Sequence, residues 1–142
     1  MRAYPILAIA TCIPSLFFAA CETPRGSSDP CRAGAFNDAG NLAIISSPAP
    51  GDTVPSGTSI NGCGRAFEGT LNYKLTGRDG SILASGFTQT GGADGAAPFR
   101  FILRYTISQT QLGHLEVFAD DPSDGEGFPP SRCVIPIQLV TK

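Results

Sequence analysis

Ile60–Leu75, with the sequence INGCGRAFEGTLNYKL, is the stretch that decides the fold. In its second half every other residue is apolar, namely Leu71, Tyr73 and Leu75. A period of two residues is typical of a β-strand with one face in the core and one in solvent. The first half is rich in glycine, which permits positive φ and close approach of backbones. We therefore predict two strands, Thr58–Gly62 and Glu68–Thr76, that are joined by a tight corner.

Five further segments have the composition of short strands with turn residues between them. They are Asn41–Ser46, Ser81–Thr90, Phe99–Ile107, His114–Ala119 and Cys133–Thr141. The clearest is Phe99–Ile107, in which every second residue is apolar, and in Ser81–Thr90 we expect Leu83 and Phe87 to share the inward face. Pro48, Pro50 and Pro55 exclude a central strand from the segment between Asn41–Ser46 and Thr58–Gly62. The prediction is an all-β, immunoglobulin-like β-sandwich of about seven antiparallel strands.

Composition agrees with this fold and excludes several classes of protein. The 142 residues are 42% hydrophobic and 15% charged, with 17 glycines and 12 prolines. This length suits one domain with one core, and this composition disfavours helix bundles. The net charge is −2 and the basic residues are scattered, so we expect no nucleic-acid partner.

The N-terminus predicts export and lipidation. Residues 1–20 have a basic start and an apolar run too short to span a bilayer, and they form the expected signal peptide. The junction Phe18-Ala19-Ala20-Cys21 resembles a bacterial lipobox, which implies that Cys21 is acylated, for example with palmitate. The alternative is an ordinary secreted protein with a plain thiol. By the same resemblance, Glu22 implies the outer membrane in a Gram-negative host.

Three domains of the chain follow from this. We expect the signal peptide at 1–20, the lipidated Cys21 with a flexible tether at 21–40, and the sandwich at 41–142. The predicted localisation is therefore the outside of a bacterial membrane, held there by lipid.

The remaining cysteines are Cys31, Cys63 and Cys133. An oxidising compartment favours one disulfide and leaves one thiol over. If successive strands alternate in direction, all three cysteines lie at one end of the sandwich. We prefer Cys63–Cys133, because both lie in or beside strands, while Cys31 with either one stays open. The wide spacing without a CxxC does not favour zinc.

The order of several short motifs carries a family resemblance. They are Ser46–Val54, Gly62, Ala66–Thr70, Asp79–Gly80, Leu83–Ala84, Gly86, Phe99, Gly113–Phe118, Asp124–Gly125 and Ile135–Ile137. From about Leu42 to Val140 the chain resembles the Gmad2 family, the immunoglobulin-like domain named for its presence in bacterial spore germination proteins. The resemblance implies a seven-stranded, non-catalytic module outside the cytoplasm. Members often sit beside other envelope domains, and we expect none here, so a role in germination is not carried over.

No catalytic residues are predicted. His114 is the only histidine, no serine lies in a G-x-S-x-G elbow, and no nucleophile is paired with a base. An acidic cluster comprises Asp120, Asp121, Asp124 and Glu126. Its spacing does not match an EF-hand, and a turn explains it more simply than calcium. We therefore expect neither a metal nor a cofactor.

Binding residues are expected on loops, because loops on a rigid sandwich commonly carry recognition. The weak candidates are Phe128, Asp120, Asp121 and Asp124, and by strand parity we place the loops 91–98 and 120–130 at opposite ends or edges. Phe67, Phe87 and Phe118 are expected mostly in the core. For Glu68 we favour a structural role, in which the carboxylate accepts backbone N–H groups of the corner, over a binding role.

The sequence thus predicts a lipid-anchored, non-enzymatic domain that binds an envelope protein or a cell-wall polymer. The alternatives are an inhibitor of an envelope protease and a structural component of the envelope.

Overall fold

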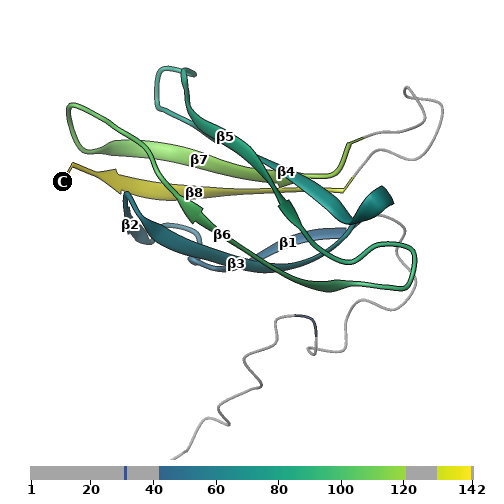
Figure 1. The fold of residues 1–142 in the computed structure, drawn as a ribbon. Helices are drawn as coiled ribbons and strands as arrows, with labels where there is room; N and C mark the ends of the chain where they lie inside the picture. The colour runs from purple at the N-terminus through teal and green to yellow at the C-terminus, as the bar shows by residue number, and fades with distance from the viewer. Residues whose placement is uncertain (1–30, 32–41, 121–130, 142) are drawn as a thin grey trace, which may run out of the picture.

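A computed structural model of the chain describes residue 31 and residues 42–120 and 131–141. Eight strands form two facing sheets (Figure 1). They are β1 (Leu42–Ser47), β2 (Thr53–Pro55), β3 (Thr58–Arg65), β4 (Thr70–Thr76), β5 (Ile82–Gln89), β6 (Ala97–Leu103), β7 (Gln111–Phe118) and β8 (Arg132–Val140), with one 3₁₀ turn, η2 (Phe67–Gly69). The described residues contain no helix long and apolar enough to cross a lipid bilayer.

The sheets have the strand orders β1-β3-β6 and β2-β8-β7-β4-β5. This arrangement confirms the predicted all-β sandwich and all seven predicted strands, and it adds β2. The added strand pairs in parallel with β8, whereas every other pairing of named strands is antiparallel. Because β2 lies at a sheet edge, its Pro55 removes no donor that a neighbouring strand would need. The prolines therefore excluded a central strand, as predicted, but not an edge strand.

The core fills the space between the sheets with aliphatic side chains. Those with no exposed surface are Val54, Ile60, Leu71, Leu75, Leu103, Leu115, Val117, Ile137 and Leu139. Tyr73 stacks on Phe101 at 4.1 Å between ring centroids, which closes one side of this core. The alternation predicted for β4 and β6 is thereby confirmed, since each inward position lies in the core or packs against it.

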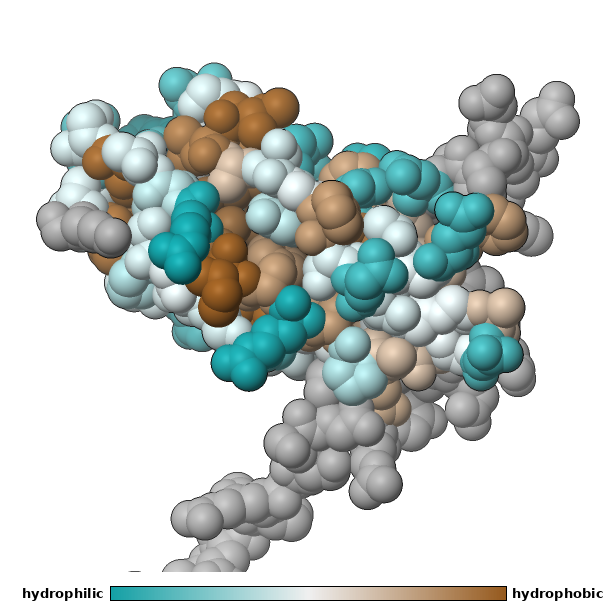
Figure 2. Space-filling model, viewed as in Figure 1, coloured by the Kyte–Doolittle hydropathy of each residue, from teal (hydrophilic) through white to brown (hydrophobic). Residues whose placement is uncertain are grey.

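The expectation for β5 was wrong at Phe87, whose side chain is 69% exposed. The register explains the error: Leu75 pairs with Ala84 and Thr76 with Ile82, so Leu83 is an extra residue in β5. Such a β-bulge reverses the phase of the alternation beyond it. Leu83 and Ala84 therefore both pack against the core, and Phe87 faces solvent. Figure 2 shows that apolar patches occur on one face of the molecule.

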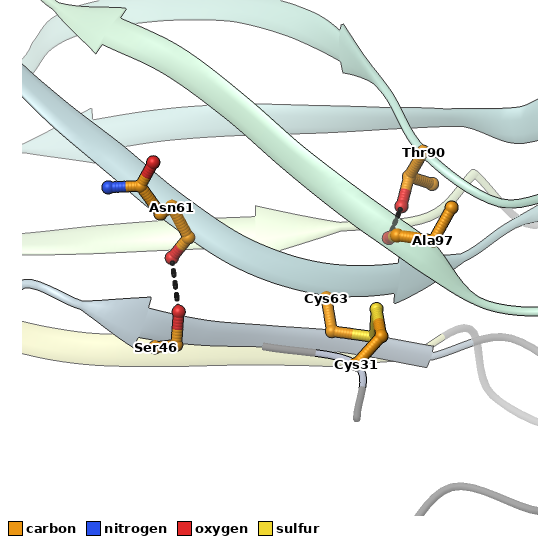
Figure 3. The surroundings of a disulfide bond; sticks show 6 residues. All are labelled: Cys31, Ser46, Asn61, Cys63, Thr90 and Ala97. Atoms are coloured by element: carbon orange, nitrogen blue, oxygen red, sulfur yellow. Dashed lines mark hydrogen bonds between the residues drawn. A yellow bond between two sulfur atoms is a disulfide. The ribbon is translucent and has the colours of Figure 1, made fainter. Parts of the chain in front are cut away.

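The disulfide joins Cys31 to Cys63, with Cα atoms 5.2 Å apart (Figure 3). The preferred pairing of Cys63 with Cys133 was therefore wrong, although the alternative with Cys31 had been left open. Cys63 is three positions from the inward Ile60, so it lies on the outer face of its sheet. Cys133 is a free thiol that packs against the core from the opposite sheet. The two thiols thus point away from each other.

Residues 77–80 form the hairpin loop between β4 and β5, and Asp79 stabilises it. Its Oδ1 accepts hydrogen bonds from the Ser81 hydroxyl at 2.6 Å and the Ser81 amide at 3.0 Å. These two bonds, the hydroxyl first, stabilise the carboxylate and lower the pKa of Asp79 below its usual value. Because the folded pKa is the lower one, this contribution to stability is present above about pH 4 and is lost as the pH falls through the folded pKa.

Ser81→Ala is expected to raise the pKa of Asp79 back towards its usual value, because the substitution removes the hydroxyl donor and weakens the turn that this hydrogen bond stabilises. An NMR titration of the Asp79 carboxyl carbon in the purified full chain measures the change. An unaltered Asp79 pKa in the variant would contradict this account.

Candidate functional site

The glycine-rich corner, defined here as residues 64–70, is pinned to the segment that follows β5. The Gly91 amide donates to the Gly64 carbonyl at 3.2 Å, and the Ala66 amide donates to the Gly91 carbonyl at 2.9 Å. The Thr90 amide donates to the Gly69 carbonyl at 2.8 Å. These bonds fasten both ends of the corner to one neighbour, so the turn between them has a fixed shape.

Arg65 adds a side-chain clamp to the same segment. Its Nε donates to the Gly92 carbonyl at 3.2 Å, and its Nη2 donates to the Ala93 carbonyl at 3.1 Å. The corner and the clamped loop enclose a hollow of about 510 Å³, which is lined by residues of both, with Gln89 and Thr90 between them. The hollow is therefore walled by ordered backbone.

Phe67 stands at the rim of this hollow with 65% of its surface exposed. The expectation that it belongs to the core was wrong. The reason lies in the next residue, because Glu68 has a left-handed backbone with φ 59° and ψ 11°. This conformation is uncommon for a residue with a Cβ, and it costs about 1 kcal/mol or more. This sharp turn at η2 leaves Phe67 outside the strands, where its ring is exposed.

Glu68 lies beside Phe67 on the same rim and is also exposed. Its carboxylate makes no hydrogen bond or ion pair within the described part of the chain. The idea that this acid accepts the backbone donors of the corner is therefore not supported, since those donors bond to carbonyl oxygens instead. Its carboxylate remains available to a ligand, which favours the binding role.

The first described residues of the predicted binding loops, Gly91 and Asp120, lie at the same end of the sandwich, so the expectation that placed the loops at opposite ends or edges was wrong. Both β5 and β7 pair antiparallel with β4, so they run in the same direction and end together. The segment after β5 therefore begins beside the corner, and so does the connection from β7 to β8 (Figure 1). Cys31 is fastened at this end as well, through Cys63.

Of the acidic candidates, only Asp120 lies among the described residues. Its Oδ1 accepts a hydrogen bond from Asn72 Nδ2 at 2.8 Å, which ties the base of its loop to β4. Asp121, Asp124 and Phe128 lie outside the described residues, so their binding roles stay predictions. No group of three or more metal-ligating side chains occurs within the described ranges.

A charge cluster lies on the outer face of the five-stranded sheet. Glu116 is only 8% exposed, and its two carboxylate oxygens lie 2.9 Å from Lys74 Nζ and 2.9 Å from Arg132 Nη1. Both cations also lie within 6 Å of the Phe118 ring centroid. Because these partners already satisfy the carboxylate, we assign Glu116 to structure rather than to binding.

His114 is exposed in β7 and pairs across the sheet with Thr76 and Pro136. Neither neighbour in the register offers a carboxylate to orient the imidazole or a thiol for it to activate. The geometry at His114 therefore gives no support to a nucleophilic mechanism.

The corner, η2 and the strands around them fall within a region that identifies the family. The model of one protein family, Gmad2, described as the immunoglobulin-like domain of bacterial spore germination, matches residues 42–126. The chain belongs to this family. The match covers more than half of the sequence and confirms the resemblance, although it stops before β8. Gmad2 is not known as an enzyme family, which agrees with the absence of a predicted catalytic residue.

Other comparisons add little to the Gmad2 match. No curated protein matches the chain. Among solved structures, CopC from Methylosinus trichosporium OB3b is similar, with 13% sequence identity and a TM-score of 0.43. The alignment covers 71% of this chain and 94% of that one.

Sequence reasoning missed Arg65 and the part it plays in the Gmad2 corner. Its contacts are to carbonyl groups 27 and 28 positions away, and no local pattern reveals such a pairing. A usable signal existed for Phe67. It lies between two glycines and outside the alternating run, so no strand face was available to bury it.

Proposed function

We propose that this Gmad2 chain is a lipid-anchored, extracytoplasmic domain that binds an envelope protein through the glycine-rich corner. The observation that supports it is the exposure of Phe67 on a turn held rigid by backbone hydrogen bonds. Aromatic side chains of this kind are the usual anchors of protein interfaces, and rigidity reduces the entropy lost on binding. The flanking Glu68 and Arg65 supply the polar rim that such an anchor needs.

A protein partner is favoured over a cell-wall polymer by where the corner lies. The disulfide fastens Cys31 at the corner end, and Cys31 follows the proposed anchor by ten residues. With Cys21 acylated, the corner is therefore held close to the membrane, where other anchored proteins are concentrated. Binding of purified cell wall in place of a protein would overturn this choice of partner.

The lipid anchor has its own test. Cells that express the chain are labelled with a palmitate analogue, and the protein is isolated to measure incorporation. We expect Cys21→Ala to abolish the label, because the thiol accepts the acyl group. Equal labelling of the variant and the wild-type chain would overturn the anchor. It would leave the binding role of the corner open to its separate test.

The binding role is tested with a matched pair of aromatic residues. Phe67→Ala is expected to weaken capture of the partner about 30-fold, the effect of removing an interface anchor worth about 2 kcal/mol. Phe87→Ala is the control, since Phe87 is similarly exposed, at 69%, but lies on β5 outside the residues that line the hollow. The measurement is photo-crosslinking in intact cells, with the crosslinker placed at Ala93, an exposed residue of the same hollow, in the wild-type chain and in both alanine variants.

A single protein that is crosslinked in the wild-type chain, lost in Phe67→Ala and kept in Phe87→Ala supports the proposal. Equal losses of the crosslinked product in both alanine variants would overturn the corner as the binding surface.

A further inference from the structure

A second surface, independent of the corner, lies on the side of the sandwich where β5 and β6 face each other. Near the corner the two strands are joined, because Thr88 Oγ1 donates to the Arg100 carbonyl at 3.2 Å and Thr90 Oγ1 donates to the Ala97 carbonyl at 2.8 Å. Towards the start of β5 they diverge. There, a lateral groove of about 840 Å³ opens between Ile82 and Leu83 on one side and residues 104–108 on the other.

The first wall of the lateral groove is formed by β5, whose outer edge pairs with no other strand of its sheet. In the strand order of its sheet β5 comes last, so it pairs with β4 alone. Its sequence ILASGFTQ contains no charge and no proline, the residues with which proteins commonly block an edge. Ile82 is 65% exposed. The bulge at Leu83 turns the Leu83 side chain inward, and this side chain makes part of the groove apolar.

The second wall is held rigidly by Tyr105. The phenol donates a hydrogen bond to the Val54 carbonyl and accepts one from the Val140 amide at 3.1 Å. The Tyr105 amide donates to Ser56 Oγ at 2.9 Å. These bonds fix the segment to β2 and β8, so the groove does not depend on a movable loop.

Charge selects the occupant of the lateral groove. Among the residues that the structure describes, Arg104 is the only charged one that lines the groove, and it is exposed and makes no ion pair with any of them. Figure 2 shows apolar surface over the start of β5 and again near the end of β6, with strongly hydrophilic side chains beside the second patch. An occupant therefore needs an extended backbone, apolar side chains and a negative charge.

We propose that the lateral groove binds an extended peptide segment of a partner protein, with an acidic side chain of that segment on Arg104. The peptide lies along the open edge of β5, where backbone groups are unpaired, and its apolar side chains contact Leu83 and Ile107. Backbone pairing at a sheet edge supplies affinity in such complexes, and side-chain contacts supply specificity.

The test uses the purified full chain and a phage-displayed library of random linear peptides. We expect the enriched peptides to alternate apolar residues and to carry an acidic residue. Arg104→Glu is expected to weaken their binding tenfold or more, because it places like charges together. Arg100→Glu is the matched control, since Arg100 lies on β6, four residues before Arg104, and is also exposed but does not line the groove. Its binding is expected to be unchanged.

Hydrogen exchange locates the bound peptide. A selected peptide is expected to slow exchange of β5 amides in the wild-type chain and not in Arg104→Glu. The proposal is overturned if no peptide is enriched, if the enriched peptides lack acidic residues, or if both arginine variants lose binding equally. Protection confined to the corner would also overturn it. Since both arginines are exposed, thermal melting is expected to show both variants folded.

Discussion

Gly62→Ala is expected to lower the free energy of unfolding by about 3 kcal/mol, the upper part of the range for overpacked cores. A Cβ at this position would lie 2.1 Å from the Ile44 carbonyl oxygen and 2.2 Å from Cζ of Phe99. The first obstacle is backbone of the neighbouring β1, and the second is a ring that is 97% buried, so neither moves without disrupting the sandwich. Gly62 is therefore required by space, and not by backbone conformation.

Urea unfolding of the purified full chain measures this loss, and Gly92→Ala is the matched control. A Cβ at Gly92 would have its nearest neighbour at 3.5 Å, an ordinary contact, so the expected change is within about 0.5 kcal/mol. Equal midpoints for the two variants would contradict the packing described for Gly62.

Cys31→Ala is expected to lower the free energy of unfolding by about 3–4 kcal/mol, because it opens a loop with a sequence separation of 32. The lost crosslink restores conformational freedom to the unfolded chain, and it also frees the N-terminal segment from β3. A reductant is expected to produce the same loss in the wild-type chain and no further loss in the variant. Urea unfolding with and without the reductant checks both expectations.

Cys133→Ser is the control for this prediction, since that thiol is free. The variant is expected to keep its sensitivity to the reductant. Loss of that sensitivity in Cys133→Ser, together with its retention in Cys31→Ala, would show that Cys63 pairs with Cys133 and would contradict the structure.

The sandwich was predictable because its longest strands alternate cleanly. Phe99 and Leu103 were assigned to the core from their two-residue period alone, and both are buried. β2 was missed because three residues are too few for a period, and its pairing with β8 is contact between distant parts of the chain. The exposure of Phe87 was missed for another reason, since the bulge at Leu83 is visible only in the register with β4.

Two errors concern information that the sequence did contain. Ile60 is the large apolar residue of the predicted strand Thr58–Gly62, which favours an inward position for it. Cys63 follows it by an odd number of positions, so the alternation already indicated the outer face for Cys63. Likewise, the two loops follow the fourth and the sixth of the predicted strands, and two even-numbered strands end together when successive strands alternate in direction. Parity therefore already placed the starts of both loops at one end, as the pairing of β5 and β7 with β4 shows. The strained Glu68 and the clamp of Arg65 were not predictable, because each depends on where the segment after β5 lies.

The Cys31–Cys63 bond also sets the reach of the domain. With Cys21 acylated, as proposed, ten residues separate the anchor from the first crosslinked position, a span of at most about 35 Å. Without the bond, 21 residues separate Cys21 from Leu42, the start of β1, and their span is at most about 70 Å. Doubling the length of a flexible tether lowers the effective concentration of the corner about threefold, because that concentration falls as the −3/2 power of tether length. The oxidised chain thus meets its membrane-bound neighbours at a higher local concentration than the reduced chain does.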